Sequence, residues 1–377
     1  MEPIYLDYNA TTPIDTQVAD AIMPFLKQTL GNPSSSHWFG IISRKAVIKA
    51  RKQVAELINC KPDEVIFTSG GTESNNCALR GYAFANRHKG NHIITSVIEH
   101  PSIIEVCKYL EKHNFKVTYL PVDKNGLISV KSVQRAITQN TILISIMHAN
   151  NEVGTIQSIT EIAEVANENG ICMHTDAAQS IGKISVDVEK LNVDLLTIAG
   201  HKIYAPKGIG ALFIKQDIKL EKLMFGAKQE SNHRAGTENV LEIVGLGKAC
   251  EIAKQNLFKN YEHLKAMRDR LWNGLVNKIP DVRLNGHPEK RLPNTLNVSF
   301  LNMNEYFQLS LFLEVAASTG SACHSNITSL SYVLEAMNIP VEYAMGTIRF
   351  STGKMTTKNE IDKAITKITE IYSTQIR

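Results

Sequence analysis

The chain has 377 residues, of which 43% are hydrophobic and 21% are charged. This composition is that of an ordinary globular protein and excludes a disordered or fibrous chain. The 41 Lys and Arg residues nearly balance the 37 Asp and Glu residues, which leaves a formal net charge of +4. The charge therefore gives no indication of direct nucleic-acid binding, and the length suggests about two domains.

The six cysteines are scattered without the CxxC spacing of structural zinc sites, and no residue pattern indicates a metal. The N-terminal segment lacks the basic and apolar regions of a signal peptide. No apolar run approaches the ~20 residues that a membrane span requires. We therefore expect a cytoplasmic protein that neither contacts a membrane nor binds a metal.

Short β-branched runs alternate with helical patterns through the first two thirds of the chain. This alternation predicts an α/β fold with a mainly parallel sheet of seven strands, covered by helices on both faces. The predicted strands are 64–68, 92–96, 116–120, 141–147, 171–174, 195–198 and 210–214. The predicted crossover helices are 43–58, 101–113 and 158–169.

A long helical pattern over 238–278, with Gly245 and Gly247 as weak points, leads into a second unit. That unit is predicted to be a smaller α+β domain. Its predicted strands are 282–285, 295–300, 314–318 and 347–351, and its predicted helices are 306–313, 329–337 and 357–374. We expect a large domain over 14–250 and a small domain formed by 1–13 and 251–377.

Lys202 follows a predicted buried strand and precedes a Pro/Gly turn. A lysine at the carboxyl edge of an α/β sheet lies where ligands bind, and an apolar site lowers its pKa enough to make it a nucleophile. Asp176 ends another strand, where it could keep a heterocyclic nitrogen protonated. Gly71 and Thr72 follow a third strand and precede a helix, whose N-terminus attracts phosphate.

Each of these residues has a simpler explanation when taken alone. A lysine is usually solvated, a strand-end aspartate usually caps a helix, and two glycines usually form a turn. His100, Asn151 and Thr237 are further candidates in predicted loops. Together, however, a phosphate cradle, an acid, an imidazole, an amide and a lysine are the components of a pyridoxal phosphate site.

The whole chain resembles the cysteine desulfurase family, within the class V branch of the fold type I pyridoxal phosphate transferases. The resemblance rests on the motifs at 5–13, 31–37, 200–202 and 347–351. It implies that Lys202 carries the cofactor as a Schiff base and that Asp176 pairs with the pyridinium nitrogen. It also implies that His100 stacks on the cofactor ring.

The resemblance extends to the substrate. Gln179 and Asn151 would lie near the phenolic oxygen of the cofactor and near the substrate. Arg349 would pair with the carboxylate of the substrate L-cysteine, through the bidentate geometry that a guanidinium provides.

For the phosphate, the resemblance implies contacts from Gly71, Thr72 and His201. In the family, a threonine of the partner subunit completes this phosphate site. Thr237 matches that threonine, so a homodimer is implied.

Cys323 decides the type of reaction. It lies in the Gly/Ser-rich segment 318–325, which resembles the mobile nucleophile loop of the family, whereas the other five cysteines lie within or beside apolar patterns. A thiolate here could take the sulfur of bound L-cysteine, which leaves L-alanine and a persulfide on Cys323. His100 is the expected proton donor or acceptor for the thiols, and His324 could favour the thiolate by its charge.

Two departures from the family pattern leave alternatives open. Ala199 replaces a serine that donates to the phosphate, and the segment around Lys228 lacks consecutive glycines. Ala199, together with the segment 322–325, also suggests a selenocysteine lyase. A third hypothesis is a sulfur-relay scaffold without cofactor chemistry. For the desulfurase, a sulfur-acceptor protein is expected, for iron–sulfur cluster assembly or for tRNA or DNA (phosphorothioate) modification.

Overall fold

The alternating part of the chain forms a sheet of seven strands. They are β2 (Val65–Thr68), β3 (His92–Ser96), β4 (Lys116–Leu120), β5 (Thr141–Ser145), β6 (Cys172–Asp176), β7 (Leu195–Ala199) and β8 (Gly210–Ile214). Their order is β2-β8-β7-β6-β5-β3-β4, and every neighbouring pair is parallel except the two that β8 makes. The predicted α/β class and the predicted seven strands are confirmed.

The computed structural model describes residues 3–303, 305–319, 321–324 and 327–376, with side chains for all of these except 305, 321–329 and 376. None of the described helices combines the length and the apolar character that crossing a bilayer requires.

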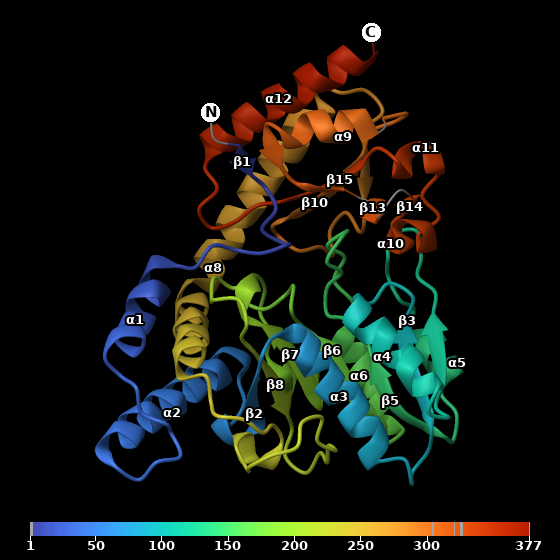
Figure 1. Cartoon of the computed structure of the whole chain (residues 1–377). Coiled ribbons are helices and arrows are strands. Elements are labelled where there is room, and N and C mark those ends of the chain that lie inside the picture. Colours follow the sequence, from blue (N-terminus) through green and yellow to red (C-terminus); the bar gives the residue numbers. More distant parts are fainter. Residues whose placement is uncertain (1–2, 304, 320, 325–326, 377) are drawn as a thin grey trace.

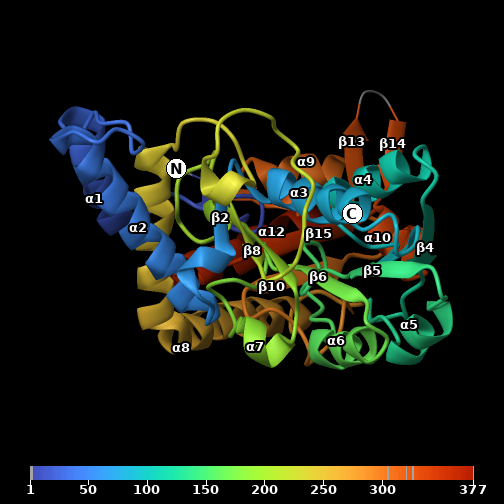
Figure 2. The ribbon, with the colours of Figure 1, turned by 90° about the horizontal axis from the view of Figure 1, so that it is seen from below.

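Helices cover both faces of the large sheet. Figure 2 shows α3 (Gly71–Ala85) and α4 (Pro101–Glu111) on one face. The opposite face carries α5 (Val130–Ala136), α6 (Ile159–Glu168) and α7 (Val188–Leu191). Every residue of the central strands β5, β6 and β7 is therefore buried, as expected for a doubly covered parallel sheet.

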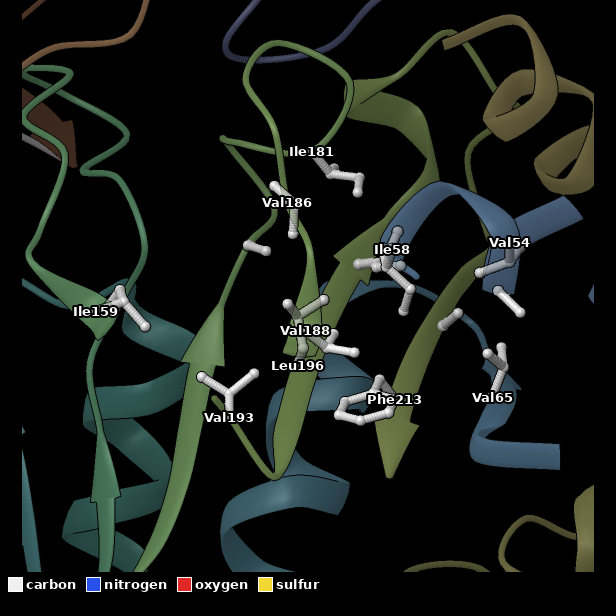
Figure 3. Close-up of a cluster of buried hydrophobic side chains, with 14 of the residues drawn as sticks. Val54, Ile58, Val65, Ile159, Ile181, Val186, Val188, Val193, Leu196 and Phe213 are labelled. Atoms are coloured by element: carbon white, nitrogen blue, oxygen red, sulfur yellow. The ribbon is translucent and has the colours of Figure 1, made fainter. Parts of the chain in front are cut away.

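Part of this core lies between the sheet and α2 (Trp38–Ile58). Figure 3 shows Val54 and Ile58 of α2 near Leu196 and Phe213 of the sheet. The preceding helix, α1 (Thr16–Lys27), lies beside α2 at the edge of the molecule (Figure 1). This packing holds the strands, and therefore the residues at their carboxyl ends, in fixed positions.

The long helix α8 (Val240–Val276) connects two hydrophobic cores (Figure 1). Ile243 belongs to the core of the large sheet, whereas Leu271 belongs to the second core. The helix is continuous through its predicted weak points, Gly245 and Gly247. A Cβ at Gly247 would lie 2.5 Å from Cα of Ala50, so the glycine serves the close approach of α8 to α2.

The second core surrounds an antiparallel sheet of order β12-β15-β10-β9. Its strands are β9 (Arg283–Asn285), β10 (Thr295–Ser299), β12 (Ser318–Thr319) and β15 (Thr347–Ser351). Its helices are α9 (Glu305–Phe312), α10 (Tyr332–Ala336), α11 (Val341–Ala344) and α12 (Lys358–Ile376). Strand β1 (Ile4–Tyr5) pairs with β11 (Val315–Ala316), which attaches the N-terminal segment to this unit. We propose that the two cores correspond to the two expected domains.

The segment around Cys323 differs from its prediction. Instead of a loop, β13 (Ser321–His324) pairs with β14 (Ile327–Leu330) as an antiparallel hairpin, with Cys323 opposite Thr328. The β-branched residues of β14 favour a strand, and the pairing partner supplies the hydrogen bonds that a single segment cannot. The helix predicted over 329–337 consequently starts at Tyr332, and the strand predicted over 314–318 is divided between β11 and β12.

Candidate active site

A cavity of about 330 Å³ opens at the carboxyl ends of the parallel strands. Its volume is within the range of small-molecule sites. The predicted site residues in its wall are Gly71, Thr72, His100, Asn151, Asp176, Gln179, His201, Lys202 and Arg349. The fold therefore gathers into one cavity residues that lie far apart in the sequence.

Lys202 ends the short 3-10 helix η2 (Gly200–Lys202), which directly follows β7. Its Nζ donates hydrogen bonds to the backbone oxygens of Asn9 at 2.5 Å and Ala10 at 2.8 Å. Burial, together with the charge of Arg349, lowers the pKa of Lys202 to about 8. A substantial part of this amine is therefore neutral near pH 7.5 and can act as a nucleophile.

Asp176 is the last residue of β6, and both of its carboxylate oxygens have partners. Oδ2 accepts a hydrogen bond from Nδ2 of Asn75 at 2.8 Å, and Oδ1 accepts one from the backbone N–H of Ala178 at 2.9 Å. These bonds hold the carboxylate in one orientation at the cavity wall. The arrangement suits an acid that faces a protonated ring nitrogen.

His100 is the N-cap of α4. Its Nδ1 accepts a hydrogen bond from the backbone N–H of Ser102 at 3.1 Å and lies 2.7 Å from Oγ of the same serine. The ring lines the cavity, and burial by the surrounding protein lowers the pKa of His100. The charge of Asp176 opposes this shift, and that of Lys202 adds to it. The net effect lowers the pKa, so the imidazole is mainly neutral at pH 7.

One end of the cavity can bind an anion. Helix α3 begins at Gly71, and its N-cap Gly70 offers no side chain to the first N–H groups. Such N–H groups, with the helix dipole, bind phosphate. Beside them, burial lowers the pKa of His201 to about 4, so its ring is neutral and keeps one N–H to donate. Ala199 offers only a methyl group here.

Arg349 lies at another part of the wall. Its Nη2 donates to Oδ1 of Asp7 at 2.8 Å and to Oγ of Ser318 at 2.7 Å, and its Nη1 donates to the backbone oxygen of Asn151 at 3.1 Å. Among the described residues, Nε of Arg349 and Oδ1 of Asn151 are buried without a hydrogen-bond partner. Unpaired buried polar atoms are costly, so both are suited to a ligand.

The family model for aminotransferase class-V matches residues 4–364. This chain belongs to that family. A cysteine desulfurase IscS of Dictyoglomus turgidum is 50% identical over 361 residues, which cover 95% of this chain and 92% of that protein. A cysteine desulfurase IscS of Methanosarcina thermophila is 48% identical over 374 residues, which cover 98% and 91%.

Solved structures agree with this assignment to the class-V family. A NifS-like protein superposes with a TM-score of 0.93 at 37% identity, covering 99% of this chain and 100% of that chain. SspA in complex with cysteine superposes with a TM-score of 0.83 at 37% identity, covering 94% and 99%. The predicted family, the fold class and the cofactor, pyridoxal phosphate, are confirmed.

The residues present fit the cofactor of the class-V family. Gly71 and Thr72 begin an uncapped helix at the phosphate end, and Asp176 provides a buried carboxylate. Lys202 provides an amine of lowered pKa in the same cavity. The unpaired Oδ1 of Asn151 is a further polar atom that a bound group would satisfy.

Thr237 and Cys323 are the two remaining predicted site residues. Thr237 is exposed and lies outside the cavity wall. The side chain of Cys323 lies outside the described side chains, and only its backbone position on β13 is given. Of the other five cysteines, four are buried as expected, whereas Cys60 is half-buried.

Sequence reasoning missed four polar residues beside the site. Asn75 contacts Asp176, and Ser102 contacts both Asn75 and His100, as described above. Asn9, which is 1% exposed, accepts through Oδ1 a hydrogen bond from Nζ of Lys183 at 3.2 Å. Lys183 also donates to Oε1 of Gln179 at 2.9 Å. The sequence held a signal for Lys183, because it follows Gln179 by four residues. This spacing brings side chains together in a helical turn.

Proposed function

We propose that this protein is a pyridoxal phosphate-dependent cysteine desulfurase, which converts L-cysteine to L-alanine and leaves a persulfide on Cys323. The observation that carries the proposal is the single cavity in which Lys202, Asp176, His100 and Arg349 meet. The relatives named cysteine desulfurase at 45–50% identity support this activity.

The bound cofactor supplies an electron sink for the substrate Cα. Nζ of Lys202 takes the proton from Cα, because its lowered pKa leaves a neutral amine near neutral pH. The carboxylate of Asp176 keeps a positive charge at the ring nitrogen. Arg349 holds the substrate carboxylate, which binds either at Nε or in place of the Asp7 carboxylate. Gln179 and Asn151 orient the substrate and the phenolic oxygen of the cofactor.

Cys323 then accepts the sulfur. Its thiolate attacks the substrate Sγ, so an S–S bond forms while the Cβ–S bond breaks, and the electron pair stays on carbon. A proton added to that carbon, and the return of a proton from Nζ of Lys202 to Cα, complete L-alanine. The sulfur atom remains on the protein as a persulfide, which an acceptor protein can take for iron–sulfur cluster assembly or for tRNA or DNA modification.

We also propose a homodimer in the cytoplasm. Residues of the segment 227–231 and of helix α2 line a surface hollow. Ile48 lines this hollow and Trp38 lies at the start of the same helix, and they are 59% and 66% exposed. Exposed apolar surface is one mark of a protein–protein interface. A second copy covering this surface would bring an exposed Thr237 to the phosphate end of the neighbouring cavity.

The segment before Thr237 is firmly attached to the large sheet. Glu230 is buried and accepts hydrogen bonds from Nη2 of Arg51 at 2.7 Å and from the backbone N–H of Phe67 at 2.8 Å. Arg234 donates to Glu73 of α3 at 3.0 Å. These contacts fix the route of the segment and so give Thr237 a defined place for a contact with a second copy.

The test compares Cys323→Ser with Cys60→Ser, a matched control at a half-buried thiol of raised pKa. Each protein receives L-cysteine, alanine is quantified, and persulfides are alkylated and mapped. We expect Cys323→Ser to keep the yellow colour of the cofactor and to bind cysteine without forming a persulfide. Alanine and persulfide production at the parent rate would overturn the mechanism.

Selenocysteine lyase activity is the second candidate, because Ala199 places a methyl group at the phosphate end of the cavity. Turnover of L-selenocysteine in the same assay separates the two activities, since a lyase would act on selenocysteine and leave L-cysteine unchanged. A purified protein without the yellow cofactor colour would instead support the sulfur-relay scaffold.

A further inference from the structure

Asp176 and His100 are connected by a chain of hydrogen bonds through two residues that the reaction itself does not use. Nδ2 of Asn75 donates to Oδ2 of Asp176 and to Oγ of Ser102, each at 2.8 Å. Oγ of Ser102 lies 2.7 Å from Nδ1 of His100. Asn75 is 1% exposed, so water does not compete for these bonds.

The carboxylate of Asp176 determines the direction of every bond in this chain. An ionised carboxylate only accepts hydrogen bonds, so the amide of Asn75 must turn its NH₂ group toward Asp176. The second hydrogen of that NH₂ group then goes to Oγ of Ser102. Since Ser102 accepts there, its own hydroxyl proton is available to Nδ1 of His100.

Nδ1 of His100 therefore receives hydrogens and does not carry one. The backbone N–H of Ser102 donates to its lone pair, and the hydroxyl, 2.7 Å away, is assigned as a second donor by the chain above. In a neutral imidazole, one nitrogen donates and the other accepts. The proton of neutral His100 must then lie on Nε2, which has no protein partner among the described residues, in a ring that lines the cavity.

We propose that Asn75 and Ser102 are positioning residues that hold neutral His100 as the Nε2–H tautomer. The ring then presents a hydrogen-bond donor to the cavity, and its basic nitrogen is occupied on the protein side. Neutral His100 consequently donates a hydrogen bond to the substrate sulfur and does not act as a base. A neutral histidine at a helix N-terminus serves as an electrophile in other enzymes by the same physics.

The consequence for catalysis rests on the proposed function, but the tautomer can be observed without turnover. The test uses protein labelled with ¹⁵N-histidine, with and without bound cofactor, and His100→Gln to assign the signal. Nitrogen shifts followed over pH give both the tautomer and the pKa. We expect neutral His100 to carry its proton on Nε2.

Ser102→Ala removes the hydroxyl donor and keeps the backbone donor. The charged groups facing the ring from other elements, Asp176 and Lys202, remain in place. The loss of one hydrogen bond to the neutral form should raise the pKa of His100 by about half a unit to one unit and should allow some Nδ1–H tautomer. Ser102→Thr, which retains a hydroxyl, should restore the parent values.

Ser158→Ala, at the start of α6 on the opposite face of the sheet, is the matched control and should change neither property. An Nδ1–H tautomer in the parent protein, or an unchanged pKa and tautomer in Ser102→Ala, would overturn the inference. The expected tautomer in a protein that forms no alanine from L-cysteine would overturn the proposed function alone.

Discussion

Asp176 ends β6, and Lys202 closely follows the end of the neighbouring strand β7 in a seven-stranded sheet. Cys323, by contrast, lies on a two-stranded hairpin whose described pairing is internal. Strands buried on both faces hold their ends within a narrow range of positions, which proton transfer requires. A two-stranded hairpin is marginally stable by itself. We propose that proton transfer takes place at the rigid strand ends and that the sulfur is accepted on the less rigid hairpin.

The hairpin is nevertheless attached to the cavity at its C-terminal end. The hydroxyl of Tyr332 donates to the backbone oxygen of Glu99 at 2.6 Å, and Glu99 directly precedes His100. Oγ of Ser331 donates to Oε2 of Glu152, which directly follows Asn151. The end of β14 is thereby fixed to the two loops that carry His100 and Asn151.

The largest expected loss of activity is that of Lys202→Ala, at the edge of the large sheet. Without the amine, no covalent attachment of the cofactor and no removal of the Cα proton are possible. Turnover should fall by about four orders of magnitude or more. Borohydride reduction followed by peptide mapping checks the assignment, and a modified lysine at any other position would contradict it.

Asp176→Asn should have the next largest effect. The variant should retain the cofactor, because the phosphate and lysine contacts remain, but it loses the charge that holds the ring nitrogen protonated. We expect kcat to fall about 10²- to 10³-fold. Stopped-flow spectra and alanine formation measure this loss, and turnover equal to that of the parent would rule out the electronic role.

The lowered pKa of Lys202 predicts a pH dependence for cofactor attachment to the cofactor-free protein. Only the neutral amine reacts, so the rate should rise about tenfold per unit toward pH 8 and level off above it. The control is the reaction of the cofactor with Nα-acetyl-lysine, whose amine has an ordinary pKa. This control accounts for titration of the cofactor itself, and its rate should continue to rise above pH 8. A profile for the protein that parallels this control would contradict the lowered pKa.

The smallest expected loss of activity comes from a change beside the hairpin that carries Cys323. Tyr332→Phe removes one hydrogen bond near the end of β14 and should slow persulfide formation by about two- to tenfold, with an unchanged cofactor spectrum. The matched control is Tyr119→Phe on the distant strand β4, which removes a hydrogen bond from the tyrosine hydroxyl to Glu111 at the end of α4. Equal rates in the two variants would show that the hairpin does not depend on this attachment.

The sequence by itself determined the alternation of strands and helices, the long helix α8 and the places of Lys202 and Asp176 at strand ends. These features depend on periodicity and on local residue types, which are readable without a structure. The resemblance to the class-V family supplied roles for residues as distant as His100 and Arg349. None of this reasoning required knowledge of which side chains touch.

Only the tertiary structure showed that Asn75 and Ser102 join Asp176 to His100, that Lys183 and Gln179 meet Asn9, and that the segment around Cys323 is a hairpin. A Gly/Ser-rich segment predicts a loop when its pairing partner is not considered. Likewise, an asparagine or serine in a helix carries no sign of its partner. Hydrogen bonds between distant segments depend on how the sheet and its helices pack, which local sequence does not encode.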